Sequence, residues 1–167
     1  MALDFTLPDT DGTPTPLHVD GARAAVVVFT CNHCPYALGW HDRIQAVARD
    51  YADRGVRVLQ INPNDAERYP RDSPAAMKAR VDAGEFASPY LYDESQEVAR
   101  AYGAKTTPDV FVLDANGVVY RGAPDADHGD PSLNAAWLRA ALDDVLAGRA
   151  VANPETKPVG CSIKWRR

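Results

Sequence analysis

Two cysteines, Cys31 and Cys34, are separated by two residues and followed directly by Pro35. Thiols at this spacing can form a redox couple, half of a metal site, or two inert buried groups. In a redox couple, one thiolate attacks a substrate disulfide, and a second thiol one helical turn away resolves the mixed disulfide. If Cys31 caps a helix, the unpaired amides and the positive end of the helix dipole favour its thiolate.

Cys34 is expected to be the inner partner of this couple. It lies three residues before Ala37 and four before Leu38, so helical geometry places it on the same side as the apolar residues of the helix. We therefore expect Cys31 to be the exposed, attacking thiol and Cys34 to be the less exposed, resolving thiol.

Asn32 and His33 lie between the cysteines and are the residues expected to tune the couple. A protonated His33 would stabilise a thiolate and make the couple more oxidising. An exposed loop histidine without a role fits the sequence equally well. His41, one helical turn beyond Ala37, is expected on the surface.

Metal binding is an alternative use of the cysteine pair. A closed zinc site takes four ligands, and only one further cysteine, Cys161, is present. The four histidines, at positions 18, 33, 41 and 128, show no ligand spacing. We therefore predict no metal and no other cofactor. Cys161 is interpreted either as a small buried apolar residue in the C-terminal tail or as an additional resolving or regulatory thiol.

Length and composition are those of one ordinary globular domain. The chain has 167 residues, of which 46% are hydrophobic and 25% charged. The net charge of −5, with both signs mixed along the chain, argues against nucleic acid or an anionic membrane as a partner. A secretory signal and a run of about 18 apolar residues are both missing, so we expect a cytoplasmic protein. In a reducing cytosol such a cysteine pair favours redox catalysis over a structural disulfide.

The elements that must position the pair can be predicted from hydrophobic periodicity. Residues 24–30 form a continuous apolar run, which is typical of a strand buried on both faces. Helical spacing of apolar residues continues from Pro35 until Gly55, and residues 56–61 form a second buried strand. The segment therefore predicts a right-handed βαβ unit with parallel strands.

The rest of the chain predicts a mixed sheet with helices on both faces. We expect one α/β domain over residues 1–149, an insertion at about 63–92 with its own helix at 73–83, and a C-terminal tail at 150–167 that packs on the domain. Further helices are predicted at 94–102 and 133–146, and residues 110–113 and 118–120 flank Asn116-Gly117 as a hairpin. Near the N-terminus, Asp11-Gly12 predicts a turn after a short extended piece.

Several short segments, in this order, resemble the thioredoxin superfamily, in particular its TlpA-like and AhpC/TSA-type members with an N-terminal extension and a central insertion. They are Asp4-Phe5-Thr6-Leu7-Pro8, Cys31-Asn32-His33-Cys34, Asn64-Asp65 with Tyr69-Pro70, Asp93-Glu94-Ser95-Gln96, Thr107-Pro108-Asp109 and Gly160-Cys161-Ser162-Ile163-Lys164-Trp165. The resemblance covers nearly the whole chain. It implies an α/β, thioredoxin-like fold.

The resemblance also implies roles for individual residues. Cys31 would be the nucleophile and Cys34 the resolver. Thr107 and Pro108 would be joined by a cis peptide bond that packs against the pair and shapes the substrate groove. Composition and spacing alone predict only that Pro108 begins an edge strand, because proline cannot donate to a ladder.

The chain departs from the family pattern at three places. Thioredoxins carry a buried acid six residues before the first cysteine, where Ala25 stands here, so another base or water must accept the proton of Cys34. Thr30 replaces the tryptophan that usually precedes the motif. The PxxxTxxC pattern of peroxiredoxins is missing, because Val28 stands three residues before Cys31.

These observations favour a thiol-disulfide oxidoreductase that acts on protein or small disulfides and is served by an upstream reductant. One alternative is a thiol peroxidase, in which Cys34 or Cys161 resolves a sulfenic acid. Another is a redox-sensing module whose cysteines hold a soft metal such as Cu(I). The sequence leaves the oligomeric state and the direction of electron flow open.

Overall fold

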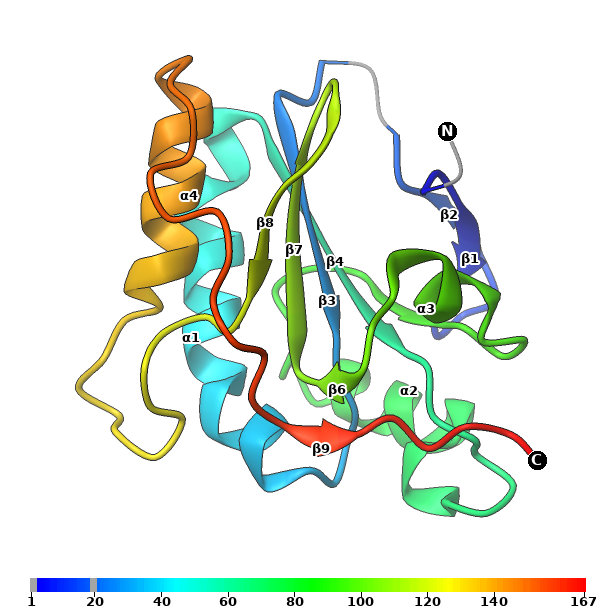
Figure 1. Ribbon diagram of the computed structural model, residues 1–167. Helices are drawn as coiled ribbons and strands as arrows, with labels where there is room; N and C mark the ends of the chain where they lie inside the picture. Colours follow the sequence, from blue (N-terminus) through cyan, green and yellow to red (C-terminus); the bar gives the residue numbers. More distant parts are fainter. Residues whose placement is uncertain (1–2, 19–20) are drawn as a thin grey trace.

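The computed structural model describes residues 3–18 and 21–167, and its centre is a five-stranded mixed sheet with the strand order β5-β4-β3-β7-β8 (Figure 1). The strands are β3 (Ala24–Phe29), β4 (Val56–Asn62), β5 (Tyr90–Tyr92), β7 (Asp109–Asp114) and β8 (Gly117–Gly122). β3, β4 and β5 run parallel, whereas β7 and β8 run antiparallel to their neighbours. β3 lies in the middle and ends just before the first cysteine, which places the pair at the centre of one sheet edge.

Helices cover both faces of the sheet. α1 (Pro35–Tyr51) and α4 (Ala136–Leu146) lie on one face, and α3 (Glu97–Tyr102) lies on the other (Figure 1). α2 (Pro74–Asp82) and the short 3-10 turn Pro70–Asp72 form the insertion, and a second 3-10 turn, Ala52–Arg54, follows α1. The prediction of a thioredoxin-like α/β fold with helices on both faces is confirmed.

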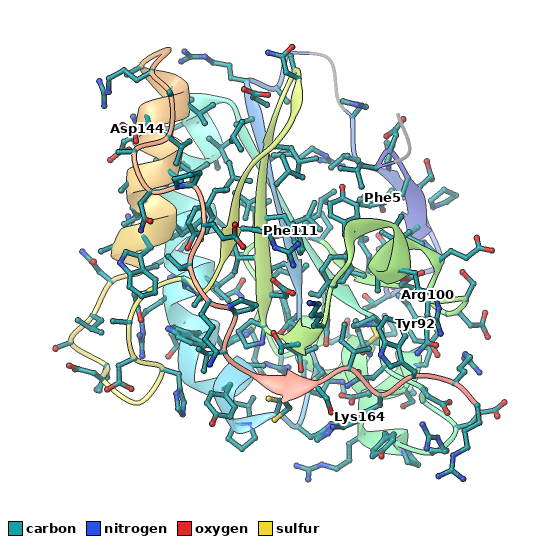
Figure 2. The ribbon with its side chains drawn as sticks, viewed as in Figure 1. Phe5, Tyr92, Arg100, Phe111, Asp144 and Lys164 are labelled. Carbon is teal, nitrogen blue, oxygen red and sulfur yellow. The ribbon has the colours of Figure 1, made fainter. Side chains whose placement is uncertain are left out.

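The strand β3 owes its position to side chains that are apolar on both faces. Val26 and Val28 pack in the core under α1 and α4, whereas Val27 and Phe29 pack in the core under α3. Because successive side chains in a strand point to opposite faces, a continuous apolar run suits a central strand covered by two layers of helices. Figure 2 shows Phe111 of the neighbouring β7 at the middle of this sheet.

Two small sheets complete the fold. β1 (Thr6–Pro8) and β2 (Pro14–Pro16) form an antiparallel hairpin around the predicted turn. β6 (Thr106–Thr107) pairs with β9 (Cys161–Ser162), so the C-terminal tail joins the chain directly before Pro108 (Figure 1). The predicted tail therefore does pack on the domain. Residues 1 and 2, with which the predicted domain begins, lie outside the described residues.

The sequence misplaces some element boundaries. Residues 90–92, counted with the insertion, instead form the edge strand β5. α3 and α4 begin a few residues later than predicted because Gln96 and Ala135, directly before them, adopt left-handed backbone angles, with φ values of 64° and 61°. Among the described residues, no helix is both long enough and apolar enough to cross a membrane.

Candidate active site

The two cysteines lie where β3 passes into α1. Cys34, and not Cys31, is the N-cap of the helix, and Pro35 occupies the first helical position. Cys34 has extended backbone angles of φ −74° and ψ 126°, as expected for a residue that precedes proline. The expectation that Cys31 caps the helix is therefore wrong, because the proline shifts the cap onto the residue before it.

Both sulfurs are enclosed. Cys31 is 1% exposed and Cys34 is 0% exposed, so the predicted contrast between an outer and an inner thiol is missing. The two cysteines form a small apolar cluster with Ala37, against which Tyr36 and Cys161 pack. A substrate can therefore reach either sulfur only when part of this cover moves.

Thr107 contacts both cysteines. Its hydroxyl Oγ1 lies 3.4 Å from Cys31 Sγ, and its carbonyl oxygen lies 3.1 Å from Cys34 Sγ. The peptide bond between Thr107 and Pro108 is cis, as the resemblance implied. The segment before β7 thus lies directly against the pair, although 76 residues separate Thr107 from Cys31.

The ionisations of the two thiols are coupled. Their mutual hydrogen bond is the largest cause of opposite shifts: it raises the pKa of Cys31, which burial raises further, and it lowers the pKa of Cys34 to about 4. The contact with the Thr107 carbonyl favours the other position, because this oxygen only accepts and therefore requires a proton on Cys34. We conclude that the two thiols ionise as a coupled pair, and that the Thr107 carbonyl keeps the proton that remains after the first ionisation on Cys34.

Several hydrogen-bond donors support a negative charge on the pair. The hydroxyl of Thr107 and the backbone amide of His33 both lower the pKa of Cys31. The backbone amide of Ala37, at the start of α1, lowers the pKa of Cys34. The start of the helix therefore favours a negative charge on the pair, although its donor, the Ala37 amide, contacts Cys34 and not Cys31.

His33 pairs with a buried carboxylate that the sequence analysis missed. Its Nδ1 lies 2.7 Å from Oδ2 of Asp72. Asp72 is fully buried and also accepts hydrogen bonds from the Asn32 amide at 2.7 Å and from Asn64 Nδ2 at 2.9 Å. The ring of Tyr69 stacks on His33 with an interplanar angle of 2°. His33 is thus held in place, and it is not a free loop histidine.

Asn32 connects the active-site loop to the insertion. Its Oδ1 accepts hydrogen bonds from Arg80 Nη1 at 2.9 Å and from the Tyr90 hydroxyl at 2.8 Å. Its Nδ2 donates to the carbonyl of Arg71 at 2.8 Å. Asn32 therefore holds the loop between the cysteines in place. It affects the redox couple by positioning this loop and not by contact with a sulfur.

One group of possible metal ligands includes a cysteine of the pair. Cys31 Sγ, a ring nitrogen of His33 and a carboxylate oxygen of Asp72 all lie within 4.8 Å of one another. Both oxygens of Asp72 already accept hydrogen bonds from asparagines, and a carboxylate is a poor ligand for a soft metal. The arrangement therefore suits a hydrogen-bonded carboxylate beside a thiol better than a Cu(I) site.

Cys161 and His41 occupy different surroundings. Cys161, in β9, is paired in register with Thr107 and packs against the cysteine pair, so the structure brings this third thiol to the site. His41 lies outside it, half-buried, with Nε2 2.6 Å from the carbonyl oxygen of Glu85. The expected surface position of His41 is therefore only partly correct.

Comparison with known proteins agrees with this arrangement of fold and site. The model of the AhpC/TSA family matches residues 1–121. The chain belongs to the AhpC/TSA family. The match includes the cysteine pair and the Thr107-Pro108 segment, and it ends before the tail that carries Cys161.

Individual relatives place this AhpC/TSA protein among thioredoxin-like chains. A conserved, uncharacterized protein of Geobacillus kaustophilus is 41% identical, with a TM-score of 0.90 over 98% of this chain and 89% of that one. The exposed lipoprotein thioredoxin of Streptococcus pneumoniae, at 19% identity and a TM-score of 0.61 over 75% of this chain and 92% of that one, shares the fold alone. The thiol-disulfide oxidoreductase ResA of Halalkalibacterium halodurans is 21% identical over 72% of this chain. The match spans 65% of ResA, slightly less than two thirds of its length.

Proposed function

We propose that this AhpC/TSA protein is a thiol-disulfide oxidoreductase whose redox couple is Cys31 and Cys34. The observation that carries the proposal is the contact of one residue, Thr107, with both sulfurs, at 3.4 Å and 3.1 Å. This contact distinguishes the two thiols, because the hydroxyl can donate to a thiolate on Cys31 whereas the carbonyl accepts the proton of Cys34. The similarity to ResA, which is named a thiol-disulfide oxidoreductase, supports the same reaction.

The proposed reaction is reversible thiol-disulfide exchange. The Cys31 thiolate attacks one sulfur of a protein or small disulfide, and the other substrate sulfur leaves as a thiolate. Cys34 then loses its proton and attacks Cys31, which releases the second substrate thiolate and forms the Cys31–Cys34 disulfide. An upstream dithiol must return two electrons to the pair before the next turnover. The cytoplasmic location remains a prediction.

Reduction of insulin disulfides by the prereduced protein tests this function. The wild type is expected to precipitate the insulin chains, and Cys31→Ser to be inactive. Titration against glutathione buffers, read by mass after thiol trapping, should give one two-electron transition between about −280 and −120 mV. A wild type no faster than Cys31→Ser, or a protein that forms no Cys31–Cys34 disulfide, would contradict the proposal.

The two alternatives receive less support from the site. A peroxidase lacks its PxxxTxxC pattern here, and peroxide consumption no faster than that of free cysteine would exclude it. A soft-metal module would have to displace the donors already bound to Asp72. Less than stoichiometric copper in protein purified with added copper would exclude that module.

A further inference from the structure

Cys161 lies against the cysteine pair although it is 127 residues away from Cys34 in the sequence. The antiparallel pairing of β9 with β6 sets Cys161 opposite Thr107, whose carbonyl faces Cys34. Both the thiol and the backbone amide of Cys161 interact with the Cys34 sulfur and lower its pKa. Cys34 thus interacts with two other thiols, that of Cys31 in the loop before α1 and that of Cys161 in the tail.

The tail that carries Cys161 is held firmly in this position. Ile163 donates its amide to the carbonyl of Lys105 at 3.1 Å, and Lys164 donates its amide to Asn64 Oδ1 at 2.9 Å. Asn64 is also the residue that donates to Asp72, so one side chain contacts both the tail and the carboxylate beside His33. Figure 2 shows Lys164 on this segment, next to β9.

Gly160 permits the close approach. A Cβ atom at this position would lie 2.4 Å from the Thr107 carbonyl oxygen and 3.1 Å from the Pro108 nitrogen. Only a residue without a side chain can bring Cys161 so near to the segment that contacts both catalytic sulfurs. The position of Cys161 beside the pair therefore requires a glycine directly before it.

Exposure differs among the three thiols. Cys31 and Cys34 are buried, whereas Cys161 is partly exposed. A disulfide between Cys31 and Cys34 is therefore out of reach of a thiol reductant in the closed structure. A disulfide that includes the partly exposed Cys161 should need a smaller opening of the site.

We propose that Cys161 is a third redox-active thiol. It attacks Cys34 in the Cys31–Cys34 disulfide and forms a Cys34–Cys161 disulfide, which a thiol reductant then reduces. This inference rests on the proposed function. In the first step the Cys161 thiolate attacks Cys34 Sγ. The Cys34–Cys161 bond forms, the Cys31–Cys34 bond breaks, and Cys31 leaves with the electron pair as a thiolate. No net oxidation takes place in this step.

The second step requires two electrons from a thiol reductant, such as two molecules of glutathione. The first thiolate attacks Cys161 Sγ and releases Cys34 as a thiolate. The second attacks the sulfur of the bound glutathione and releases Cys161, so that glutathione disulfide leaves and all three cysteines are reduced. The protein then returns to its starting state.

The hydrogen bond between Cys34 and Cys161 favours this order of events. In the reduced protein the pKa of Cys161 is raised to about 11, first by burial and then by its hydrogen bond with Cys34. When Cys34 is part of a disulfide, this hydrogen bond between two thiols is lost. Cys161 therefore ionises more readily in the oxidised protein, in which its attack is needed.

Disulfide mapping of Cys31→Ser protein tests the inference. After mild oxidation with diamide, thiol trapping and digestion, we expect an intramolecular disulfide between Cys34 and Cys161. The same bond should appear as a minor species in partly oxidised wild type, which covers the case in which Cys31→Ser fails to fold. Absence of the bond from both proteins would overturn the inference.

A rate measurement separates this inference from the proposed function. Fully oxidised Cys161→Ser should be reduced by glutathione at least fivefold more slowly than wild type, whereas Ser162→Ala, with an exposed side chain in the same strand, should match wild type. If Cys161→Ser forms the Cys31–Cys34 disulfide but is reduced at the wild-type rate, the inference fails and the proposed function stands. If Cys161→Ser forms no such disulfide, the proposed function itself fails.

Discussion

At the scale of single residues, the reactivity of the two buried sulfurs depends on three neighbouring side chains. They are Thr107, His33 and Asp72. Thr107 contacts both sulfurs through different atoms, and His33 sits beside Cys31 with a buried carboxylate behind it. These contacts replace the exposed helix-capping thiolate that the sequence suggested. The reactivity of the pair should therefore respond to changes in side chains that carry no sulfur.

Replacement of Thr107 by valine removes the hydroxyl that lies 3.4 Å from Cys31 Sγ but keeps the carbonyl that faces Cys34. A hydrogen bond to a charged group contributes about 1.5–3 kcal/mol. We therefore expect the first apparent pKa of the pair to rise by about one unit, read from thiolate absorbance at 240 nm across a pH titration. Thr107→Ser keeps a hydroxyl and should restore the wild-type value. Equal pKa values for all three proteins would show that this hydroxyl does not stabilise the thiolate.

Replacement of His33 by alanine removes an imidazole whose ring nitrogen lies within 4.8 Å of Cys31 Sγ. A protonated imidazole stabilises the thiolate of the reduced form, so its loss should favour the disulfide and lower the reduction potential by roughly 30 mV, or about 1.4 kcal/mol. The same glutathione titration measures this change. His18→Ala, at an exposed histidine, is the matched control and should leave the potential unchanged. An unchanged or higher potential in His33→Ala would mean that His33 does not stabilise the Cys31 thiolate.

At the scale of elements, most of the fold could be predicted because its signals are local. The strands β3 and β4, the helix α1 and the hairpin of β7 and β8 follow from apolar periodicity and from turn residues. The edge strand β5 and the pair of β6 and β9 could not be predicted, because strands of two or three residues depend on a partner elsewhere in the chain.

The same limit applies to the site. Cys31, Cys34 and Thr107-Pro108 were found from spacing and from family resemblance. Asp72 was missed because nothing in its local sequence shows that the insertion folds back and buries this carboxylate beside His33. Its donor Asn64 belongs to a segment that carried the resemblance, and this is the one signal that could have pointed to the buried cluster.

The pairing of β9 with β6 lies next to the two buried sulfurs, so a change in β9 should alter the access of reagents to them. Gly160→Ala would place a Cβ atom 2.4 Å from the Thr107 carbonyl oxygen and should weaken the pairing of β9 with β6. A loss of about 1.4 kcal/mol raises the open population about tenfold. We therefore expect N-ethylmaleimide to modify Cys31 and Cys34 about tenfold faster, as followed by mass spectrometry.

Gly129→Ala is the matched control for this measurement. A Cβ atom at Gly129 would meet only the side chain of Asp127, at 3.3 Å. The control should react at the wild-type rate. If Gly160→Ala also reacts at the wild-type rate, the tail does not cover the cysteine pair, and another segment must open to admit a substrate.

At the scale of the whole molecule, one sheet edge collects contributions from distant parts of the chain. The β3–α1 junction supplies the cysteines, the insertion supplies Asp72, and the tail supplies Cys161. The stability of the fold and the state of the site are therefore linked. Asp109, one residue after Pro108, is buried in β7 and gives this link a measurable dependence on pH.

Burial raises the pKa of Asp109 to about 6, against the lowering effect of the Lys105 amide, which donates to Oδ2 at 3.1 Å, and of Arg121, which lies 3.9 Å from Oδ2. The folded protein therefore keeps this proton at pH values at which the unfolded chain has lost it. As pH rises from about 4 to about 6, Asp109 should reduce the free energy of unfolding by up to about 3 kcal/mol.

Asp109→Asn cannot ionise and should lack this part of the pH dependence. Urea unfolding between pH 4 and pH 7 measures the effect as the difference in unfolding free energy between wild type and variant, which cancels the contributions of other groups. Relative to the variant, wild type should be more stable at pH 4 than at pH 7. Asp53→Asn, at an exposed aspartate, should follow wild type at every pH. A constant difference between wild type and Asp109→Asn would mean that Asp109 is already ionised in the folded protein at pH 4, and that Lys105 and Arg121 outweigh the effect of burial.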